Sequence, residues 1–325
     1  MNTFGRIFRI SIHGESHGKG LGILIDGCPS GISLSEPDFE HDISRRKSGS
    51  LGTTPRTESD KIEIFSGIFN GKTTGSPILL LFKNNNTKSQ DYKKLENIPR
   101  PSHADFVAKE KFSGYNDPRG GGQFSGRMTL AMVSAGVIAK KILKSVSIES
   151  KVLEVGGDKD IDKAIKKALS EKDTIGGIVE CRINNLEIGL GEPFFDSLES
   201  YISHLAFSIP ALKAIEFGAG FAFAKMNGSQ SNDLFITSGG KTKTNNSGGI
   251  NGGLSNGNEI IFRVAVKAPS SIGKSQRTIN TKSGKMVELE IGGRHDICIA
   301  LRFPVILESI SAIALADLHL INKMN

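Results

Sequence analysis

The sequence has 325 residues but contains no tryptophan and only three cysteines. The cysteines, Cys28, Cys181 and Cys298, lie far apart in the chain. This spacing excludes a disulfide framework and a cysteine-based metal site. We therefore expect a reducing compartment and no bound metal.

Long apolar segments are also missing. Residues 1–6 do not form a basic stretch followed by an apolar run, as a secretory signal would. No uninterrupted apolar stretch reaches about 18 residues, the length of a membrane span. From these two absences we expect a cytoplasmic protein without a membrane partner.

Two common nucleotide-binding motifs are absent as well. Residues 67–73 imitate a P-loop, but three residues separate their glycines where four are needed for the backbone amides to encircle a phosphate. The glycine triplet 120–122 does not form the G-x-G-x-x-G pattern of a dinucleotide fold. A flavin held in another kind of site remains compatible with the sequence.

Glycine and positive charge, by contrast, are abundant. The 38 glycines follow no collagen period and predict tight turns and backbone that lies close to ligands. A formal net charge of +7 suits a polyanionic partner, and RNA is one such partner. Arginines beside glycine-rich turns favour a small phosphate or carboxylate ligand instead, because guanidinium groups bind these anions bidentately. They are Arg45, Arg46, Arg56, Arg119, Arg127 and Arg294.

Apolar patterning predicts pairs of strands separated by helices. We expect strands at residues 6–12, 20–26, 61–69, 77–83, 177–183, 214–226 and 259–267, and helices at 35–46, 125–143, 160–172, 196–207 and 305–320. This order predicts an α+β protein with largely antiparallel sheets. No sharp boundary divides residues 1–325, which we expect to form one domain.

The segment 229–258 is rich in glycine, asparagine and serine. Its composition favours a flexible linker. A loop of this length inside a compact domain is usually functional or disordered, so both interpretations stay open.

Three short clusters carry residues suited to chemistry: Gly-Glu-Ser-His-Gly at 14–18, Arg-Gly-Gly-Gly-Gln-Phe-Ser-Gly-Arg at 119–127, and Gly-Arg-His-Asp at 293–296. His17 stands at the end of a predicted strand. It is either a functional histidine, because imidazole titrates near neutral pH, or a solvated surface residue. Ser125 would cap a helix whose N-terminus favours an anion, with Arg127 in its first turn, unless that arginine is only a surface side chain.

Asp296 and His103 allow two interpretations each. Asp296 follows two basic residues that would keep it ionised, either in a site or in a surface salt bridge. His103 belongs to a loop in which Asp105 could orient the imidazole, for function or for structure alone.

Together the three clusters resemble the chorismate synthase family, whose signature regions occur in this order. The similarity extends through Thr-Thr-Gly at 73–75, Gly-Leu-Gly-Glu-Pro at 189–193 and Gly-Gly-Ile-Asn-Gly-Gly at 248–253, so it covers essentially the whole chain. It implies a layered sandwich of antiparallel sheets and helices with internal duplication, in a homotetramer. It also implies conversion of 5-enolpyruvylshikimate-3-phosphate to chorismate with loss of phosphate, the last common step of the shikimate pathway.

The reaction of this family requires reduced FMN although it involves no net redox change. The hydrogen that is lost is poorly acidic, and an electron-rich flavin can lend an electron to expel phosphate. The resemblance implies that His17 protonates the departing phosphate, that His103 adjusts the protonation of the flavin, and that Asp296 works with the flavin to remove the hydrogen.

The resemblance also implies two sets of binding residues. The substrate would contact a cationic wall made of Arg46, Arg56, Arg127 and Arg294. The flavin would contact Arg46, Gln123, Phe124, Ser125, Pro210, Ala211, Gly252, Lys267, Ala268, Pro269, Ser270, Ser271 and Arg294.

Several positions depart from the common family pattern. Gln123 and Phe124 stand where many members carry Arg-Ser, and Ile297 stands where proline follows Arg-His-Asp. The segment 45–56 is one residue shorter than in many members, which leaves NADPH as flavin reductant an open question. Two alternatives also stay open: a non-catalytic protein that binds RNA or another anion, and a degenerate family member that binds flavin without turnover.

Overall fold

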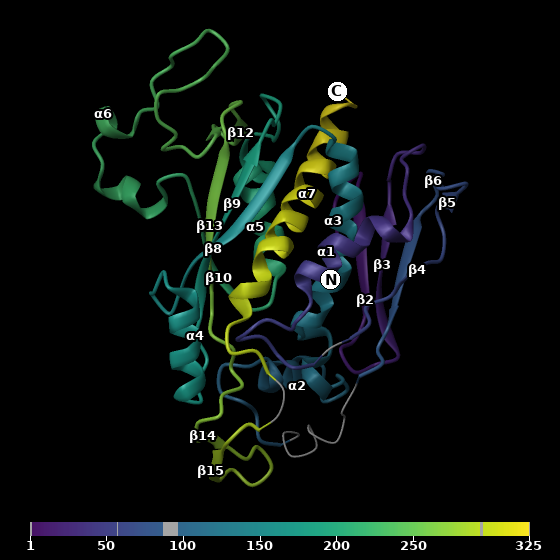
Figure 1. The fold of residues 1–325 in the computed structure, drawn as a ribbon, viewed down its shortest axis with the longest axis vertical. Helices are drawn as coiled ribbons and strands as arrows, with labels where there is room; N and C mark the ends of the chain where they lie inside the picture. Colours follow the sequence, from purple (N-terminus) through teal and green to yellow (C-terminus); the bar gives the residue numbers. More distant parts are fainter. Residues whose placement is uncertain (1, 57, 87–96, 293–294, 325) are drawn as a thin grey trace.

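The computed structural model describes residues 2–56, 58–86, 97–292 and 295–324. The helices labelled α1, α3, α5 and α7 lie between two antiparallel β-sheets (Figure 1). The first sheet has the order β1-β2-β3-β7-β4 and the second has the order β10-β13-β9-β8. The strands of these sheets are β1 Thr3–Phe4, β2 Arg9–Gly14, β3 Gly20–Asp26, β4 Ile62–Ile64, β7 Ile78–Lys83, β8 Ser147–Val155, β9 Gly177–Asn184, β10 Leu212–Phe217 and β13 Ile260–Val266.

The remaining elements are shorter strand pairs, α-helices and 3-10 helices. The strand pairs are β5 Ile68–Phe69 with β6 Lys72–Thr73, β11 Ile250–Asn251 with β12 Leu254–Ser255, and β14 Gln276–Ile279 with β15 Met286–Leu289. The α-helices are α1 Glu40–Arg46, α2 Asp105–Lys111, α3 Thr129–Leu143, α4 Ile161–Ser170, α5 Leu198–Ser208, α6 Gly228–Ser231 and α7 Phe303–Asn322. The 3-10 helices are η1 Glu36–Phe39, η3 Arg119–Phe124, η4 Gly126–Met128, η5 Phe194–Asp196, η6 Gly220–Lys225 and η7 Ile299–Arg302.

The same topology occurs twice in the chain. In each half, two strands pair with each other (β2 with β3, β8 with β9), and the second of them pairs with the last long strand (β7 or β13). The strand before the last (β4 or β10) lies on the outer side. Helices α1 and α5 follow the second strand, and α3 and α7 follow the last one. This repeated order confirms the predicted α+β class with antiparallel sheets, and it is the duplication that the resemblance implied.

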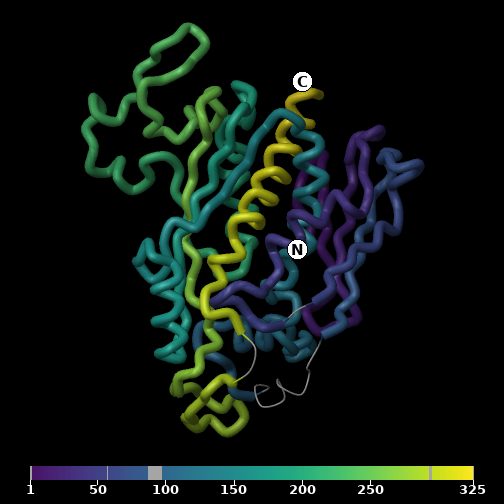
Figure 2. Tube along the Cα trace, viewed as in Figure 1, coloured from purple at the N-terminus to yellow at the C-terminus, as the bar shows by residue number. Residues whose placement is uncertain are grey.

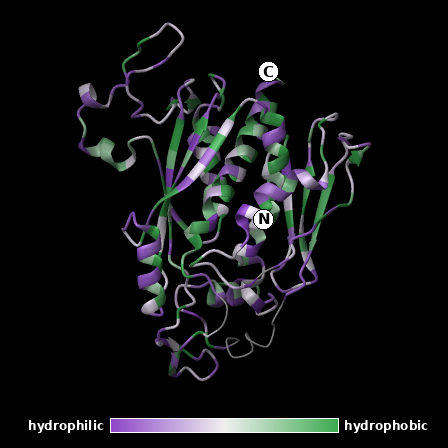
Figure 3. Ribbon diagram, in the orientation of Figure 1, coloured by the Kyte–Doolittle hydropathy of each residue, from purple (hydrophilic) through white to green (hydrophobic). Residues whose placement is uncertain are grey.

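Helices α3 and α7 form the centre of the core. A Cβ atom added to Gly136 of α3 would lie 2.4 Å from the Cβ of Ser309 in α7, so glycine is required for this close backbone contact. All of α3 is buried except Lys140 and Lys141. Figure 3 shows hydrophobic residues concentrated on these helices, between the two sheets.

Helix α7 with its preceding turn is long and apolar enough to cross a membrane by length and composition. The expectation of no such stretch was therefore too simple. However, 78% of the apolar window in Ile299–Asn322 is buried inside the protein. Packing between the two sheets accounts for its composition, as it does for other buried core helices.

Several regions differ from the sequence prediction. The strand expected at 214–226 ends at Phe217, because Gly218 and Gly220 adopt left-handed backbone (φ 55° and 53°) and η6 follows. The prediction was wrong for its second half, and it also missed α2 and β8.

The segment 229–258, which composition marked as a linker, makes an excursion from the second sheet (Figure 2). It contains β11, β12 and many internal hydrogen bonds. The Asp233 carboxylate accepts the backbone N–H groups of Asn246 and Ser247, each at 2.8 Å. Composition alone gave a poor account of this segment, because asparagine and aspartate side chains here replace sheet bonding with local contacts.

Candidate active site

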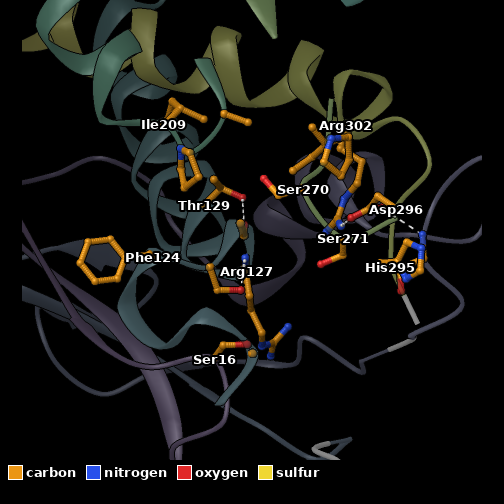
Figure 4. A pocket seen from close by; sticks show the side chains of 18 of the residues that line it. Ser16, Phe124, Arg127, Thr129, Ile209, Ser270, Ser271, His295, Asp296 and Arg302 are labelled. Atoms are coloured by element: carbon orange, nitrogen blue, oxygen red, sulfur yellow. Dashed lines mark hydrogen bonds and ion pairs between the residues drawn. The ribbon is translucent and has the colours of Figure 1, made fainter. Parts of the chain in front are cut away.

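A cavity of about 620 Å³ lies where the central helices of both halves end or begin. Its wall includes the last residues of α1 and α5, the first residues of α3 and α7, and the loops 102–104, 267–271 and 295–296. Figure 4 shows side chains from these elements pointing toward a common space. Both the volume and the mixture of polar and apolar side chains are typical of a small-molecule site.

Two buried arginines share one carboxylate in this wall. Arg46, at the end of α1, donates from Nη2 to Oδ2 of Asp60 at 2.7 Å. Arg127, in η4, donates from Nη1 to the other oxygen of Asp60 at 2.8 Å and from Nε to Oδ1 of Asn84 at 2.6 Å. Only 2% and 8% of the surfaces of Arg46 and Arg127 are exposed, so both charges are largely removed from water.

Some donors of these guanidinium groups remain unpaired. Nε and Nη1 of Arg46 and Nη2 of Arg127 have no hydrogen-bond partner among the residues that the structure describes. Burial, together with repulsion from Arg302 and Arg127, lowers the pKa of Arg46 to about 10, so it stays charged at neutral pH. Buried charged donors are expected to have partners. A phosphate or carboxylate group in the cavity would supply them, and these residues therefore fit an anionic ligand.

Arg56 extends the cationic wall on the side of the first cluster. Its Nη2 donates to Oε1 of Glu58 at 2.6 Å, and Nη1 reaches the hydroxyl of Ser16 at 3.3 Å. Glu58 is also bonded by the backbone N–H of Asn85 at 3.1 Å. Figure 4 shows Ser16 beside the end of the Arg127 side chain, so residues 16, 56 and 127 face one corner of the cavity.

His17 follows Ser16 in the chain but is not itself among the residues that line the cavity, and only 6% of its surface is exposed. It packs on Gly120, where an added Cβ atom would lie 2.3 Å from the imidazole Nδ1. Burial, helped by the charges of Arg56 and Arg119, lowers the pKa of His17 to about 4. The imidazole is therefore neutral at pH 7 without a ligand, and a nearby anion would raise its pKa.

The glycine triplet 120–122 brings the two predicted histidines to the same loop. All three glycines have left-handed backbone, with φ of 59°, 81° and 53°. The backbone N–H of Ser16 donates to the carbonyl of Gly122 at 3.2 Å, which joins the first and second clusters. An added Cβ atom at Gly121 would lie 3.5 Å from Cε1 of His103. The loop therefore needs glycine both for its conformation and for space.

His103 is held through one ring nitrogen. Its Nδ1 lies 2.7 Å from Oδ1 of Asp105, which also accepts from Arg100. Burial opposes the charge of Asp105, but hydrogen bonds from Arg100 and His103 hold the pKa of its carboxyl well below the usual range. Arg100 in turn donates to the hydroxyl of Ser271 at 3.0 Å. The ionised Asp105 fixes the ring of His103, which lines the cavity.

Asp296 lies on the opposite wall, beside His295 and Arg302 (Figure 4). Its Oδ1 accepts the backbone N–H of Thr54 at 2.9 Å, and its Oδ2 lies 3.4 Å from Nη1 of Arg302. Burial lowers the pKa of His295. Arg302, which the sequence did not single out, also donates from Nε to the carbonyl of Arg46 at 2.9 Å and so links α1 to the start of α7.

Most of the expected flavin contacts line the same cavity. They are Arg46, Gln123, Phe124, Ser125, Pro210, Ala211, Lys267, Ala268, Pro269, Ser270 and Ser271. The Nζ of Lys267 donates to the carbonyl of Ser102 at 3.0 Å and to the hydroxyl of Ser270 at 2.8 Å. This bonding ties the loop 267–271 to the loop that carries His103. Arg294 lies outside the described residues.

Gly252 is the exception among the expected flavin contacts. It belongs to the turn between β11 and β12, where Gly253 accepts the backbone N–H of Leu198 at the start of α5. The cavity instead borders Phe207 and Ser208 at the other end of that helix. Eleven helical residues separate the two ends by about 16 Å, so the structure does not bring Gly252 to this cavity.

Sequence reasoning also missed several residues of the wall, namely Glu58, Asp60, Arg100 and Arg302. Only Glu58 and Asp60 had a weak signal, because the two acids stand two residues apart just before a strand. Arg45, one of the arginines beside glycine-rich turns, instead forms a two-bond ion pair with Glu308 of α7 at 2.6 Å. It contributes to the core and does not line the cavity.

Comparisons with known proteins give one consistent result. The sequence model of the chorismate synthase family matches residues 8–320. The chain is 56% identical to chorismate synthase from Chitinophaga pinensis over 324 residues, covering 99% of this chain and 98% of that protein. It is 43% identical to chorismate synthase from Dehalococcoides mccartyi, covering 98% and 96%. A crystal structure of chorismate synthase superposes with a TM-score of 0.76 at 27% identity, covering 98% of this chain and 93% of the other.

With the family match, the identities and the shared fold in agreement, the chain belongs to the chorismate synthase family.

Proposed function

We propose that this protein converts 5-enolpyruvylshikimate-3-phosphate to chorismate by eliminating phosphate, and that it is a carbon–oxygen lyase of the shikimate pathway that requires reduced FMN. The observation that carries the proposal is the set of buried, unpaired donors on Arg46 and Arg127, in a cavity wall that also includes Asp296 and Ser16, the neighbour of His17 in the chain. The substrate has a phosphate and two carboxylates, and each of these anions needs such donors.

The flavin fits the opposite part of the cavity by the chemistry of its wall. Reduced FMN, when bound, would supply an electron-rich ring that helps to expel phosphate. The residues that would hold it are Gln123, Phe124, Ser125, Pro210, Ala211 and the loop 267–271. They offer Lys267 and three serine hydroxyls for a phosphate or a carbonyl, and an apolar surface for a ring.

His17 would act as the acid for the departing phosphate. Its pKa of about 4 means that the ligand-free imidazole carries no proton to give at pH 7. The substrate phosphate would raise this pKa, because an opposite charge stabilises the imidazolium. The proton would therefore be taken up with the substrate and returned to the phosphate as its C–O bond breaks.

Asp296 and His103 would act at the flavin side of the substrate. The N–H of Thr54 and the guanidinium of Arg302 hold the Asp296 carboxylate in place, where it would assist removal of the hydrogen. Asp105 would keep the His103 ring oriented so that its second nitrogen serves the ligand. The buried arginines would stabilise the negative charge that develops on the leaving phosphate.

We also propose that the chain forms one catalytic domain, works in the cytoplasm as a homotetramer and binds no nucleic acid. NADPH as the flavin reductant is a separate proposal with its own test. Protein mixed with oxidised FMN and NADPH without oxygen should bleach the flavin absorbance if the chain reduces its own cofactor. An unchanged flavin spectrum alongside full activity with chemically reduced FMN would mean that an outside reductant is required.

The direct test is turnover of 5-enolpyruvylshikimate-3-phosphate with chemically reduced FMN without oxygen. We expect stoichiometric phosphate release and chorismate absorbance, and a loss of at least about 100-fold in Asp296→Asn. Asp173→Asn, which removes an exposed carboxylate paired with Lys274, should retain full activity. Tight flavin binding without turnover in the unaltered protein would favour a degenerate family member.

A further inference from the structure

Asp60 joins the two arginines that retain unpaired donors, but it makes no contact that the proposed reaction requires. Its surface is 4% exposed, and each carboxylate oxygen accepts from a different guanidinium, at 2.7 Å from Arg46 and at 2.8 Å from Arg127. Its backbone has φ of 49°, in the left-handed region that only glycine, asparagine and aspartate adopt readily. Its carboxylate lies between Arg46 at the end of α1 and Arg127 in η4.

We propose that Asp60 is a positioning residue that aims the guanidinium groups of Arg46 and Arg127 at the phosphate of the substrate. This inference rests on the proposed function. In this inference Asp60 holds the two arginines in place, and the arginines bind the anion.

The hydrogen bonds show how the placement works. Asp60 and Asn84 occupy Nη1 and Nε of Arg127, so that only Nη2 is left for a ligand. Asp60 occupies Nη2 of Arg46 and leaves Nε and Nη1. Each guanidinium is therefore held at one edge with its remaining donors unpaired. Donors with a fixed orientation lose little entropy when they bind an anion.

The charges explain why a carboxylate is needed at this position. Arg46, Arg127 and Arg302 stand close enough that Arg127 and Arg302 depress the pKa of Arg46. Burial opposes ionisation of Asp60, but the two arginines lower the pKa of its carboxyl and keep it charged. Without Asp60 the two guanidinium groups would repel each other and move apart. The donors would then no longer converge.

A simpler role makes the opposite prediction. If Asp60 only balanced charge, its neutralisation would leave a more positive cavity that binds anions more tightly. If Asp60 positions the arginines, neutralisation weakens anion binding. The sign of the change separates the two roles.

The test compares Asp60→Asn with Asp42→Asn. Asp42 is also buried and bridges two cations, Lys140 at 2.7 Å and Arg45 at 3.6 Å, but it lies outside the cavity. Asparagine keeps the shape and tolerates left-handed backbone. We expect Asp60→Asn to raise the Kd for inorganic phosphate, measured by titration calorimetry, and the KM for the substrate by about tenfold or more. Asp42→Asn should change both by less than about twofold.

Asp60→Glu provides a second variant that keeps the charge and changes only the position. If Asp60 positions the arginines, this variant should also bind phosphate more weakly. If Asp60 only balances charge, its phosphate affinity should not change. Phosphate binding as tight as in the unaltered protein, in either folded variant, would overturn the inference. Failure of the unaltered protein to bind phosphate or to turn over would instead refute the proposed function itself.

Discussion

The two halves of the chain share one topology but contribute different chemistry to the cavity. In the first half, the end of α1 and the turn before α3 supply the buried Arg46 and Arg127. In the second half, the corresponding end of α5 supplies Ser208 and the backbone around Pro210, and α7 begins just after Arg302. Duplication thus provides a symmetrical frame, in which the first half supplies the buried arginines and the second half supplies mainly hydroxyl and apolar groups together with Lys267, Asp296 and Arg302.

The frame itself already favours anions. Both α3 and α7 begin at the cavity, and the partial positive charge of a helix N-terminus attracts negative groups. The two buried arginines belong to the first half, so their substitution should have the largest effect. Apart from the loss of Asp296, changes in the second half should act more through shape and orientation.

The largest effect is expected when an arginine of the first half is removed and compared with an arginine of the second half. Arg127→Ala should lower kcat/KM about 1000-fold, because it removes a phosphate donor and leaves the buried Asp60 without one of its partners. Arg302→Ala, at the matching position of the second half, should cost about 10- to 100-fold, because Arg302 holds Asp296 and the end of α1. Steady-state kinetics checks both. Equal losses of kcat/KM would mean that Arg127 and Arg302 do not differ in their roles.

A glycine substitution tests whether the first half also depends on exact packing. Gly120→Ala should lower activity about 100-fold and destabilise the protein, since the new methyl group would displace His17. Gly157 of the second half offers a matched control, because it has a similar left-handed backbone with no atom within 4 Å of an added Cβ. Gly157→Ala should lose only about 1 kcal/mol in urea unfolding and no activity. A similar loss of activity in both variants would argue against crowding of His17.

The smallest effect concerns the pH dependence of stability. The folded pKa of His17, about 4, lies below its ordinary value of 6.5, so the unfolded chain binds more protons between these values. The stability contributed by neutral His17 is therefore present above pH 6.5 and is lost as the pH falls toward 4. His17→Gln should flatten the change in unfolding free energy over this window by roughly 1–2 kcal/mol.

Urea unfolding between pH 4.5 and 7 measures this difference. His41→Gln, which changes an exposed histidine in α1, should leave the pH profile as it is in the unaltered protein. An unchanged profile in His17→Gln would show that His17 is not buried as a neutral group.

The sequence could point to only part of the candidate site, namely the residues that stand within short motifs. His17, Arg127 and Asp296 belong to clusters that combine glycine with a titratable or charged group, and such clusters can be recognised locally. Asp60 and Arg302 have no such neighbours, because their partners come from distant parts of the chain. Contacts between residues far apart in the chain produce no local sequence pattern from which they could be predicted.

The same distinction holds for the fold. Helices with a regular apolar stripe, such as α4, were predicted within a few residues, as was the cap at Ser125. The strand β8 was missed because its residues lack strong apolar character and because β9 is its only neighbouring strand in the described sheet. Gly252 was assigned to the flavin by motif, and only the length of α5 shows how far it lies from the cavity within one chain.

The close contact between Gly136 and Ser309 has a consequence for how ligands enter and leave. Because α3 and α7 touch at backbone distance, the two halves cannot open like a hinge without breaking the core. We therefore expect exchange of substrate and product to depend on the loops at the helix ends, where Lys267 holds Ser102 and Arg100 holds Ser271. A few polar contacts at the rim would then set the rate of product release, and the buried arginines would stay in place from one turnover to the next.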